Sequence, residues 1–312
     1  MEPLIQHTTP HSLAADGLAV GYDQREIIHD LSVRIPTGKI TVIVGANACG
    51  KSTLLKTLAR LLKPSRGSVL LDGKSIQQIP TREVATKLGL LPQSPTAPEG
   101  ITVADLVGRG RYPRTRWIRQ WSKEDDAAVA EAMTSTDVLS IADRPIDELS
   151  GGQRQRVWIA MALAQDTDIL LLDEPTTFLD LTHQFEVLDL LVDLNKSDDR
   201  TIVLVLHDLN QACRFGDHLI AMKDGAIVAE GNPSEVITED VVQDVFGLAV
   251  KVVPDPVAGT PMVVPIGRHT TVQDKTLQDK TEQDARPRTS PAAAALAASA
   301  AANGVCRPMD NP

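Results

Sequence analysis

Short apolar runs of strand length alternate with helical patterns over most of the chain. The runs at 40–45, 168–173 and 201–207 are almost continuously apolar. Such runs, unlike alternating ones, indicate strands that are covered on both faces, as in a parallel sheet flanked by helices. Residues 51–62 follow a helical period instead. The apolar face of that helix would consist of Leu54, Leu55, Leu58, Leu61 and Leu62. The pattern therefore predicts an α/β fold with a mainly parallel central sheet.

Three stretches depart from this alternation. Residues 219–231 predict a β-hairpin whose turn is Asp224-Gly225. Residues from about 94 to 165 carry helical patterns and few strand-like runs, which indicates an inserted helical subdomain. Near the end, a five-residue polar repeat precedes an alanine-rich run, and this composition is typical of disorder. We therefore predict a flexible leader at 1–13, one domain at 14–268 and a disordered tail at 269–312.

Composition and charge narrow the classes of function. Of 312 residues, 31 are basic and 41 acidic, the net charge is −10, and only 3% are aromatic. This balance disfavours a nucleic-acid partner, which basic and stacking side chains would bind. Three cysteines do not form a disulfide framework and indicate a reducing compartment. With no long apolar run and no signal-peptide pattern, we expect a cytoplasmic protein, with peripheral attachment to a membrane partner left open.

A phosphate-binding loop follows the first continuous apolar run. Residues 45–52, the phosphate loop, fit the pattern G-x-x-x-x-G-K-[ST] between a strand and a helix. Its glycines let successive backbone N–H groups point at phosphate oxygens, and the helix adds its positive N-terminal end. Lys51 should reach the β- and γ-phosphates, and Ser52 should ligate Mg²⁺. The expected nucleotide-binding residues are Gly45, Ala46, Asn47, Ala48, Cys49, Gly50, Lys51, Ser52 and Thr53.

Polar groups at the ends of other predicted strands indicate hydrolytic chemistry. One strand leads straight into Asp173-Glu174, and a buried strand end tolerates such charges only beside a cation or a polarised water. Asp173 is expected to hold Mg²⁺, and Glu174 to act as general base for the attacking water. His207 ends another strand and could contact the γ-phosphate. Gln93 follows a further strand-like run and could touch Mg²⁺ or water.

The signature Leu149-Ser150-Gly151-Gly152-Gln153 settles the class of protein. It precedes a predicted helix, and two glycines at a helix N-terminus allow close approach of the backbone to a phosphate. The order and spacing of the phosphate loop, Gln93, the signature, Asp173-Glu174 and His207 resemble the nucleotide-binding subunit of an ATP-binding-cassette (ABC) transporter. The resemblance covers about 13–265. It implies a P-loop NTPase core with an N-terminal antiparallel β region besides the helical subdomain.

This resemblance implies ATP and Mg²⁺ as ligands and a second copy of the chain as partner. In the family, the signature serves the nucleotide on the partner's phosphate loop, so ATP joins a head-to-tail dimer with two composite sites. The residues expected to act in trans are Ser150, Gly151, Gly152 and Gln153. Tyr22 matches the position whose ring stacks on adenine. Asp180 matches the loop that communicates between the two sites.

Two longer stretches, 103–113 and 172–191, resemble the ATPases that drive import of iron–siderophore complexes, haem or cobalamin. Phe178 and the residues around Cys49 fit the same group. This resemblance implies a peripheral subunit at the cytoplasmic face of the cell membrane. It would power a separate transmembrane permease, while an extracytoplasmic substrate-binding protein selects the substrate. Ferric-siderophore uptake is the favoured interpretation, and import of haem or cobalamin is the alternative.

Three other classes fit less well. A soluble ABC ATPase outside transport would typically carry two cassettes or a coiled-coil insertion, whereas this chain has one cassette and no heptad run. A P-loop kinase would not need the signature. An exporter half would require transmembrane helices in the same chain or beside it.

Two further local features allow predictions of their own. An arginine run with two tryptophans could face the permease and anionic headgroups, or could be a solvated face of the helical subdomain. It consists of Arg109, Arg111, Arg114, Arg116, Trp117, Arg119 and Trp121. Cys49 lies beside a lysine and a helix N-terminus, which predicts a lowered thiol pKa, inhibition of ATPase activity by alkylation, and protection by ATP. His29, His183 and His218 are interpreted as structural.

Overall fold

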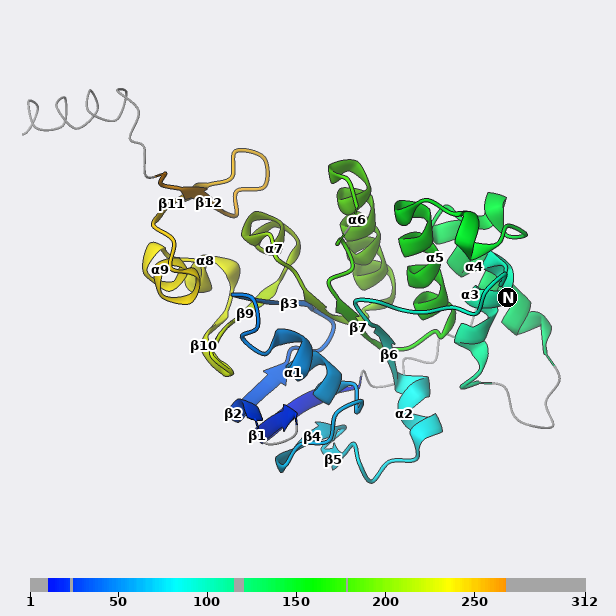
Figure 1. Cartoon of the computed structure of the whole chain (residues 1–312), viewed down its shortest axis with the longest axis horizontal. Helices are drawn as coiled ribbons and strands as arrows, with labels where there is room; N and C mark the ends of the chain where they lie inside the picture. The colour runs from blue at the N-terminus through cyan, green and yellow to red at the C-terminus, as the bar shows by residue number, and fades with distance from the viewer. Residues whose placement is uncertain (1–10, 23–24, 115–120, 178, 268–312) are drawn as a thin grey trace, which may run out of the picture. The chain divides into compact units, whose positions relative to one another are not determined.

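The computed structural model describes residues 11–22, 25–114, 121–177 and 179–267 (Figure 1). The chain divides into one compact unit up to Pro265 and a second from Ile266. The tail predicted at 269–312 lies outside the described residues. Of the leader predicted at 1–13, residues 1–10 also lie outside the described residues, whereas its last residues contact the domain. The backbone N–H of Ser12 donates to Asp72 Oδ1 at 3.0 Å, and strand β1 begins at Leu13.

A six-stranded sheet forms the centre of the first unit, in the order β10-β9-β3-β8-β7-β6. Its strands are β3 (Ile40–Gly45), β6 (Leu88–Leu91), β7 (Ile169–Asp173), β8 (Thr201–Val205), β9 (His218–Lys223) and β10 (Ala226–Gly231). All neighbours are parallel except β9 and β10, which form the predicted hairpin. Its turn residues have φ angles of 46° at Asp224 and 78° at Gly225, as the sequence Asp-Gly favours. The predicted mainly parallel sheet is confirmed.

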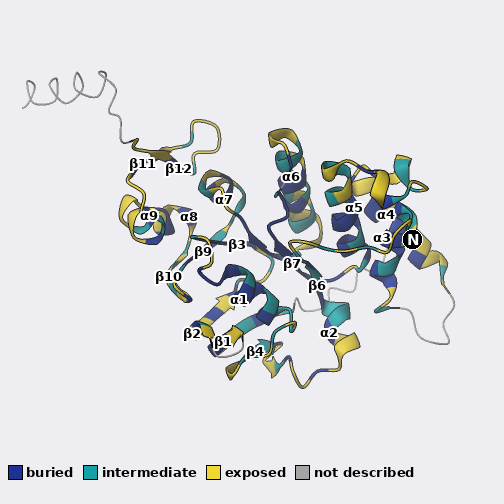
Figure 2. Cartoon of the chain, viewed as in Figure 1, coloured by how far each residue is buried: buried dark blue, intermediate teal, exposed yellow. Residues whose placement is uncertain are grey.

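Both faces of the central sheet are buried, which explains the continuous apolar runs (Figure 2). Alternate residues point to opposite faces of a strand. Val42 and Val44 therefore belong to one hydrophobic cluster, whereas Ile43 belongs to the other. The second cluster lies under a four-stranded antiparallel sheet of order β2-β1-β4-β5. Its strands are β1 (Leu13–Tyr22), β2 (Arg25–Ile35), β4 (Arg66–Leu71) and β5 (Lys74–Ser75). This sheet is the predicted N-terminal antiparallel region.

Helix α1 (Lys51–Leu58) follows β3 and packs its leucines into the second cluster. The prediction that it continues to residue 62 is wrong. Arg60 adopts a left-handed conformation with φ of 63°, and its guanidinium donates to the Ile79 carbonyl at 2.6 Å. Because the helix has ended, Leu61 does not join the apolar face and is 62% exposed. A tertiary contact therefore sets the end of this helix.

Helices α3, α4 and α5 lie together at one end of the first unit, in the stretch predicted as a helical subdomain (Figure 1). Their bounds are α3 (Val103–Gly108), α4 (Lys123–Ser135) and α5 (Gly151–Ala164). Three short 3₁₀ turns connect them: η1 (Arg109–Arg111), η2 (Leu139–Ile141) and η3 (Ile146–Glu148). Arg111 is 7% exposed, and its Nε donates to Asp125 Oδ1 at 2.9 Å. Neither interpretation of the arginine run fits this buried residue.

The other described arginines of the run are also only partly exposed. The Arg114 guanidinium donates to the carbonyls of Gln165 and Asp166, so it also has a structural partner. Arg109 is partly buried, and Trp121 is 46% exposed. Arg116, Trp117 and Arg119 lie outside the described residues. The described residues therefore do not form a continuous arginine surface.

The remaining elements complete the first unit. They are α2 (Thr81–Lys87), α6 (Leu181–Asp198), α7 (Leu209–Phe215), α8 (Pro233–Val236), α9 (Glu239–Phe246), β11 (Val250–Pro254) and β12 (Pro261–Pro265). Strands β11 and β12 pair as a separate antiparallel hairpin. In the described part of the chain, the helices lack the combination of length and apolar character that crossing a bilayer requires.

Candidate nucleotide-binding site

The phosphate loop joins β3 to α1, and two glycines shape it. Gly45 and Gly50 have φ angles of 155° and 106°. A Cβ atom on Gly45 would come within 2.3 Å of the Met222 carbonyl oxygen, so the close approach to β9 requires glycine. Lys51 is 5% exposed, and its ammonium donates to the carbonyls of Gly45 and Ala46 at 2.8 and 3.0 Å. The loop thus folds around the lysine, at the N-terminus of α1.

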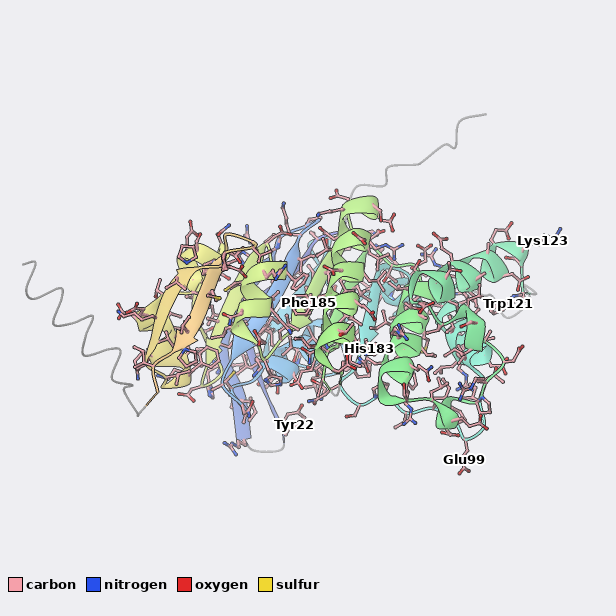
Figure 3. The ribbon with its side chains drawn as sticks, turned by 90° about the horizontal axis from the view of Figure 1, so that it is seen from above. Tyr22, Glu99, Trp121, Lys123, His183 and Phe185 are labelled. Carbon is pink, nitrogen blue, oxygen red and sulfur yellow. The ribbon has the colours of Figure 1, made fainter. Side chains whose placement is uncertain are left out.

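An open cleft of about 510 Å³ lies over this loop and α1. It is lined by Tyr22, Ile27, Asn47, Ala48, Gly50, Lys51, Ser52, Thr53, Gln93, Glu174 and His207. The structure therefore brings together predicted residues from five separate segments. Figure 3 shows Tyr22 at the end of β1, where the side chain is 47% exposed. Ile27 was not predicted, because nothing in the sequence of β2 marks the one residue that faces the cleft.

Asp173 and Ser52 form an oxygen-rich corner of the site. The Ser52 hydroxyl donates to Asp173 Oδ1 at 2.9 Å, and Asp173 is 1% exposed. Asp173 Oδ2 is buried without a hydrogen-bond partner among the described residues. Burial raises the pKa of Asp173, although the Ser52 hydrogen bond acts in the opposite direction. A hard divalent cation would satisfy the orphaned oxygen, so the two residues fit Mg²⁺.

Glu174 is held by the two other predicted catalytic residues. Its Oε1 lies 2.7 Å from His207 Nε2, and its Oε2 accepts a hydrogen bond of 2.6 Å from Gln93 Nε2. The Thr177 hydroxyl donates to the same Oε2 at 3.2 Å. The Glu174 backbone is left-handed, with φ of 54°, an uncommon conformation for this residue type that is typical of functional sites. The carboxylate is thereby fixed at the wall of the cleft.

Cys49 differs from its prediction. The thiol is 5% exposed, and burial raises its pKa above the ordinary value of 9.0, although nearby Lys51 acts in the opposite direction. The predicted lowered pKa is wrong, because the side chain packs into the hydrophobic cluster under α1. Cys49 is not among the residues that line the cleft. Cys49 therefore contributes to the loop by packing.

The signature lies outside this cleft, at the start of α5. Ser150 caps the helix: its hydroxyl accepts from the Gln153 backbone N–H, and the Gln153 side chain accepts from the Ser150 N–H. Ser150 and Gly151 are exposed, so the helix N-terminus is open to an external phosphate. Within one chain, the structure thus assembles the phosphate loop with Gln93, Glu174 and His207 but leaves the signature apart.

Asp180 caps α6 on the same side as the signature. Its Oδ1 accepts from the His183 backbone N–H at 3.0 Å and lies 2.7 Å from His183 Nδ1. These bonds lower the pKa of the Asp180 carboxyl. A Cβ on Gly152 would meet the His183 ring at 3.7 Å, so the ring lies close to both Asp180 and the signature. Phe178 lies outside the described residues.

The chain is similar to many known proteins. A model of the ABC transporter family matches residues 28–177. The chain is 58% identical over 257 residues to the probable siderophore transport system ATP-binding protein YusV of Bacillus subtilis (strain 168), covering 82% of this chain and 94% of that protein. It is 52% identical over 256 residues to the ferric enterobactin transport ATP-binding protein FepC of Escherichia coli (strain K12), covering 82% and 94%. The solved dimeric cassette MJ0796 is 29% identical, with a TM-score of 0.64 over 70% of this chain and 98% of that one.

The fold and the site together define a nucleotide-hydrolysing cassette. The chain belongs to the ABC transporter family, as one of its ATP-binding proteins. Such proteins bind ATP and hydrolyse it to power transport, so this chain is an ATPase. Cassettes of this family form dimers and work with permease components of the transporter.

Proposed function

We propose that this chain is the ATP-hydrolysing subunit that powers uptake of a ferric siderophore through a partner permease. The observation that carries the proposal is its 58% and 52% identity, over nearly the full length of the relatives, to proteins named for siderophore and ferric enterobactin transport. A further relative at 52% identity, from Bacillus anthracis, is named for petrobactin import. These three names refer to siderophores, so we favour a ferric siderophore as cargo over the alternatives of haem and cobalamin.

Two copies would bind two ATP molecules between them. Each phosphate loop would hold one triphosphate, and the partner's signature would close over it with the N–H groups of Gly151 and Gly152 and the Ser150 hydroxyl. The open N-terminus of α5, separate from the cleft of its own chain, supports this arrangement. Tyr22, exposed at the rim of the cleft, would stack on the adenine. Asp180 would meet the partner's site.

Within each site, the chain's own groups would handle the attacking water. Ser52 and Asp173, with Gln93 close by, would hold Mg²⁺, which when bound neutralises charge on the phosphate oxygens. Glu174 would accept a proton from the water at a carboxylate oxygen. His207 and Gln93, at 2.7 and 2.6 Å, would keep that carboxylate oriented. Lys51 would leave its loop carbonyls and bind the β- and γ-phosphates.

Cargo would never touch this chain. A substrate-binding protein outside the membrane would select the iron chelate and deliver it to the permease, and the cassette would lie at the cytoplasmic face. Its role can be tested by substituting Glu174→Gln, which keeps the shape of the side chain but cannot accept the proton. We expect hydrolysis to fall by about 10²- to 10⁴-fold, with ATP retained and a dimer accumulating on size exclusion. Exposed Glu230→Gln is the matched control.

Two results would contradict the proposal at different levels. If the Glu174→Gln variant bound ATP and hydrolysed it at the wild-type rate, the assignment of Glu174 as general base would be wrong. Uptake of radioactive iron as a siderophore complex should stop in cells whose only copy is Glu174→Gln. If uptake continued unchanged, the assignment of a ferric siderophore as cargo would be wrong, whereas the assignment of the chain as an ATPase would stand. Identification of the permease that co-purifies with the chain gives an independent check.

A further inference from the structure

Two helices begin directly after functional loops. Helix α6 follows Asp180, and helix α7 follows His207. Each has an aspartate as N-cap: Asp180 accepts from a backbone N–H of the first turn of α6, and Asp208 does the same for α7. The conformation of each loop is therefore coupled to the position of the helix that it starts.

A pair of glutamines joins these two first turns. Gln211 Nε2 donates to Gln184 Oε1 at 2.7 Å, although the residues are 27 apart in sequence. Gln184 Nε2 in turn donates to the Leu179 carbonyl at 2.9 Å, next to Asp180. The Gln211 backbone N–H donates to Asp208 at 2.9 Å, next to His207. A chain of hydrogen bonds thus runs from the Asp180 loop to the His207 loop, and His207 contacts Glu174.

The two glutamines share a second cavity with the catalytic base Glu174. A cavity of about 220 Å³ is lined by both glutamines and by Glu174, Thr177, His207 and Asp208, among others. Glu174 and His207 also line the nucleotide cleft, whereas neither glutamine does so among the described residues. The glutamines can therefore influence the catalytic pair without touching nucleotide.

Packing of α6 against α7 has a separate source. The rings of Phe185 and Phe215 meet edge to face with centroids 5.6 Å apart, and the Arg214 guanidinium lies 5.3 Å from the centroid of the Phe185 ring. These contacts hold the helices together without the amides. A buried amide is favourable only while it is hydrogen-bonded, so Gln211, at 7% exposure, depends on its partner.

We propose that Gln184 and Gln211 are positioning residues for ATP hydrolysis, because they tie the Asp180 loop to the His207 loop of the same chain. The proposal rests on the proposed function, in which Asp180 meets the partner's site. Closure of the dimer around Asp180 would then be transmitted through the amide pair to His207 and Glu174. Loss of the pair should lower kcat, whereas binding of ATP in the cleft should not change.

A double-mutant cycle tests this proposal in the full chain with its co-purified permease. Gln→Met keeps the length of the side chain and removes its hydrogen bonds. For Gln184→Met we expect kcat to fall about three- to tenfold, the effect of losing a well-formed hydrogen bond, with KM unchanged. Gln211→Met, which spares the bond to Leu179, should have a smaller effect. The double variant should be no worse than Gln184→Met. Gln243→Met, at an exposed position on α9, is the control.

The outcomes separate the two proposals. Wild-type kcat in both single variants, additive losses in the double variant, or a rise in KM equal to the fall in kcat would each overturn the positioning role. If Gln184→Met lowers the melting temperature, Gln211→Met carries the test alone, and wild-type kcat in it would overturn the role. Failure of the proposed function would be seen instead in Glu174→Gln, through undiminished hydrolysis, whatever the glutamine variants do.

Discussion

The buried pair of Arg111 and Asp125 holds the helical subdomain together, and removing its negative charge should destabilise the protein strongly. The two side chains are 8% and 3% exposed, with Nε and Oδ1 2.9 Å apart. Arg111 also donates to the Ala164 carbonyl at 2.9 Å, at the end of α5. Asp125 belongs to the capping box of α4 with Ser122. One guanidinium therefore joins α3, α4 and α5 through the turn that follows α3.

Asp125→Asn removes the charge and keeps the hydrogen bond from Arg111, because the amide oxygen can take the place of Oδ1. The amide NH2 then takes the place of Oδ2 and cannot accept from the Ser122 N–H, so part of the capping box is also lost. Breaking a buried ion pair by removing one partner costs about 3–5 kcal/mol, since the other charge stays buried without compensation. Because the hydrogen bond survives, we expect a loss near the lower end, about 3 kcal/mol. In a domain of this size, each kcal/mol lowers Tm by about 2–4 °C, which gives a fall of about 6–12 °C.

The pH dependence has a defined sign. Burial by itself raises the pKa of Asp125, but hydrogen bonds from Arg111 and Ser122 outweigh it and place the folded-state pKa below the ordinary 3.8. A depressed pKa contributes stability that is fully present above the unfolded-state value and is lost as pH falls through the folded-state value. The difference in unfolding free energy between wild type and Asp125→Asn should therefore be constant from pH 5 to 8 and shrink below about pH 4.

Calorimetry or circular dichroism at several pH values measures this difference. Glu131→Gln, on the exposed face of the same helix, removes an equal charge and should shift Tm little. Adding Arg111→Met to Asp125→Asn should recover part of the loss, because no uncompensated charge remains. A fall of less than about 1 kcal/mol in the single variant, or a double variant worse than the single one, would refute the reasoning.

Three further predictions concern other parts of the chain. Iodoacetamide should modify Cys49 more slowly than a free thiol at pH 8, because the pKa of the Cys49 thiol is raised. The rate of modification should keep rising above pH 9, and rapid modification at pH 7 would contradict the burial of the thiol. Gly225→Ala should destabilise by more than Gly73→Ala, since a Cβ on Gly225 would lie 1.8 Å from the Ile27 carbonyl oxygen, whereas Gly73, also with positive φ, has open space; equal melting temperatures would argue against the clash. Truncation after Arg268 should leave ATP hydrolysis unchanged, and a large fall would show that the tail contributes.

Local patterns allowed most of the site to be predicted. The phosphate loop depends on glycines at fixed spacing, and the signature on a cap followed by two glycines, so each could be recognised without knowledge of distant contacts. The central strands were predictable because burial on both faces leaves continuous apolar runs, as at β3 and β8. Gln93, Glu174 and His207 each follow a separate apolar run in the sequence, and the structure brings these residues together.

Long-range contacts explain what the sequence did not reveal. Arg111 looks like a surface arginine until α4 supplies Asp125, and Arg60 ends α1 through a bond to Ile79. The Cys49 thiol has a lysine and a helix terminus nearby in sequence, yet its surroundings in the core decide its pKa. Gln184 and Gln211 each look like ordinary helical residues, and only the fold shows that they bond to one another.

In the proposed dimer, one copy's phosphate loop and the partner's signature close over the same ATP. A crystal or cryo-electron microscopy structure of Glu174→Gln with ATP and Mg²⁺, in complex with the co-purified permease, tests it most directly. In that complex, the Ser150 hydroxyl of the second copy should lie at hydrogen-bond distance, about 2.7–3.0 Å, from a γ-phosphate oxygen bound at Lys51 of the first. A closed complex with ATP at Lys51 and both Ser150 hydroxyls far from any γ-phosphate would contradict it.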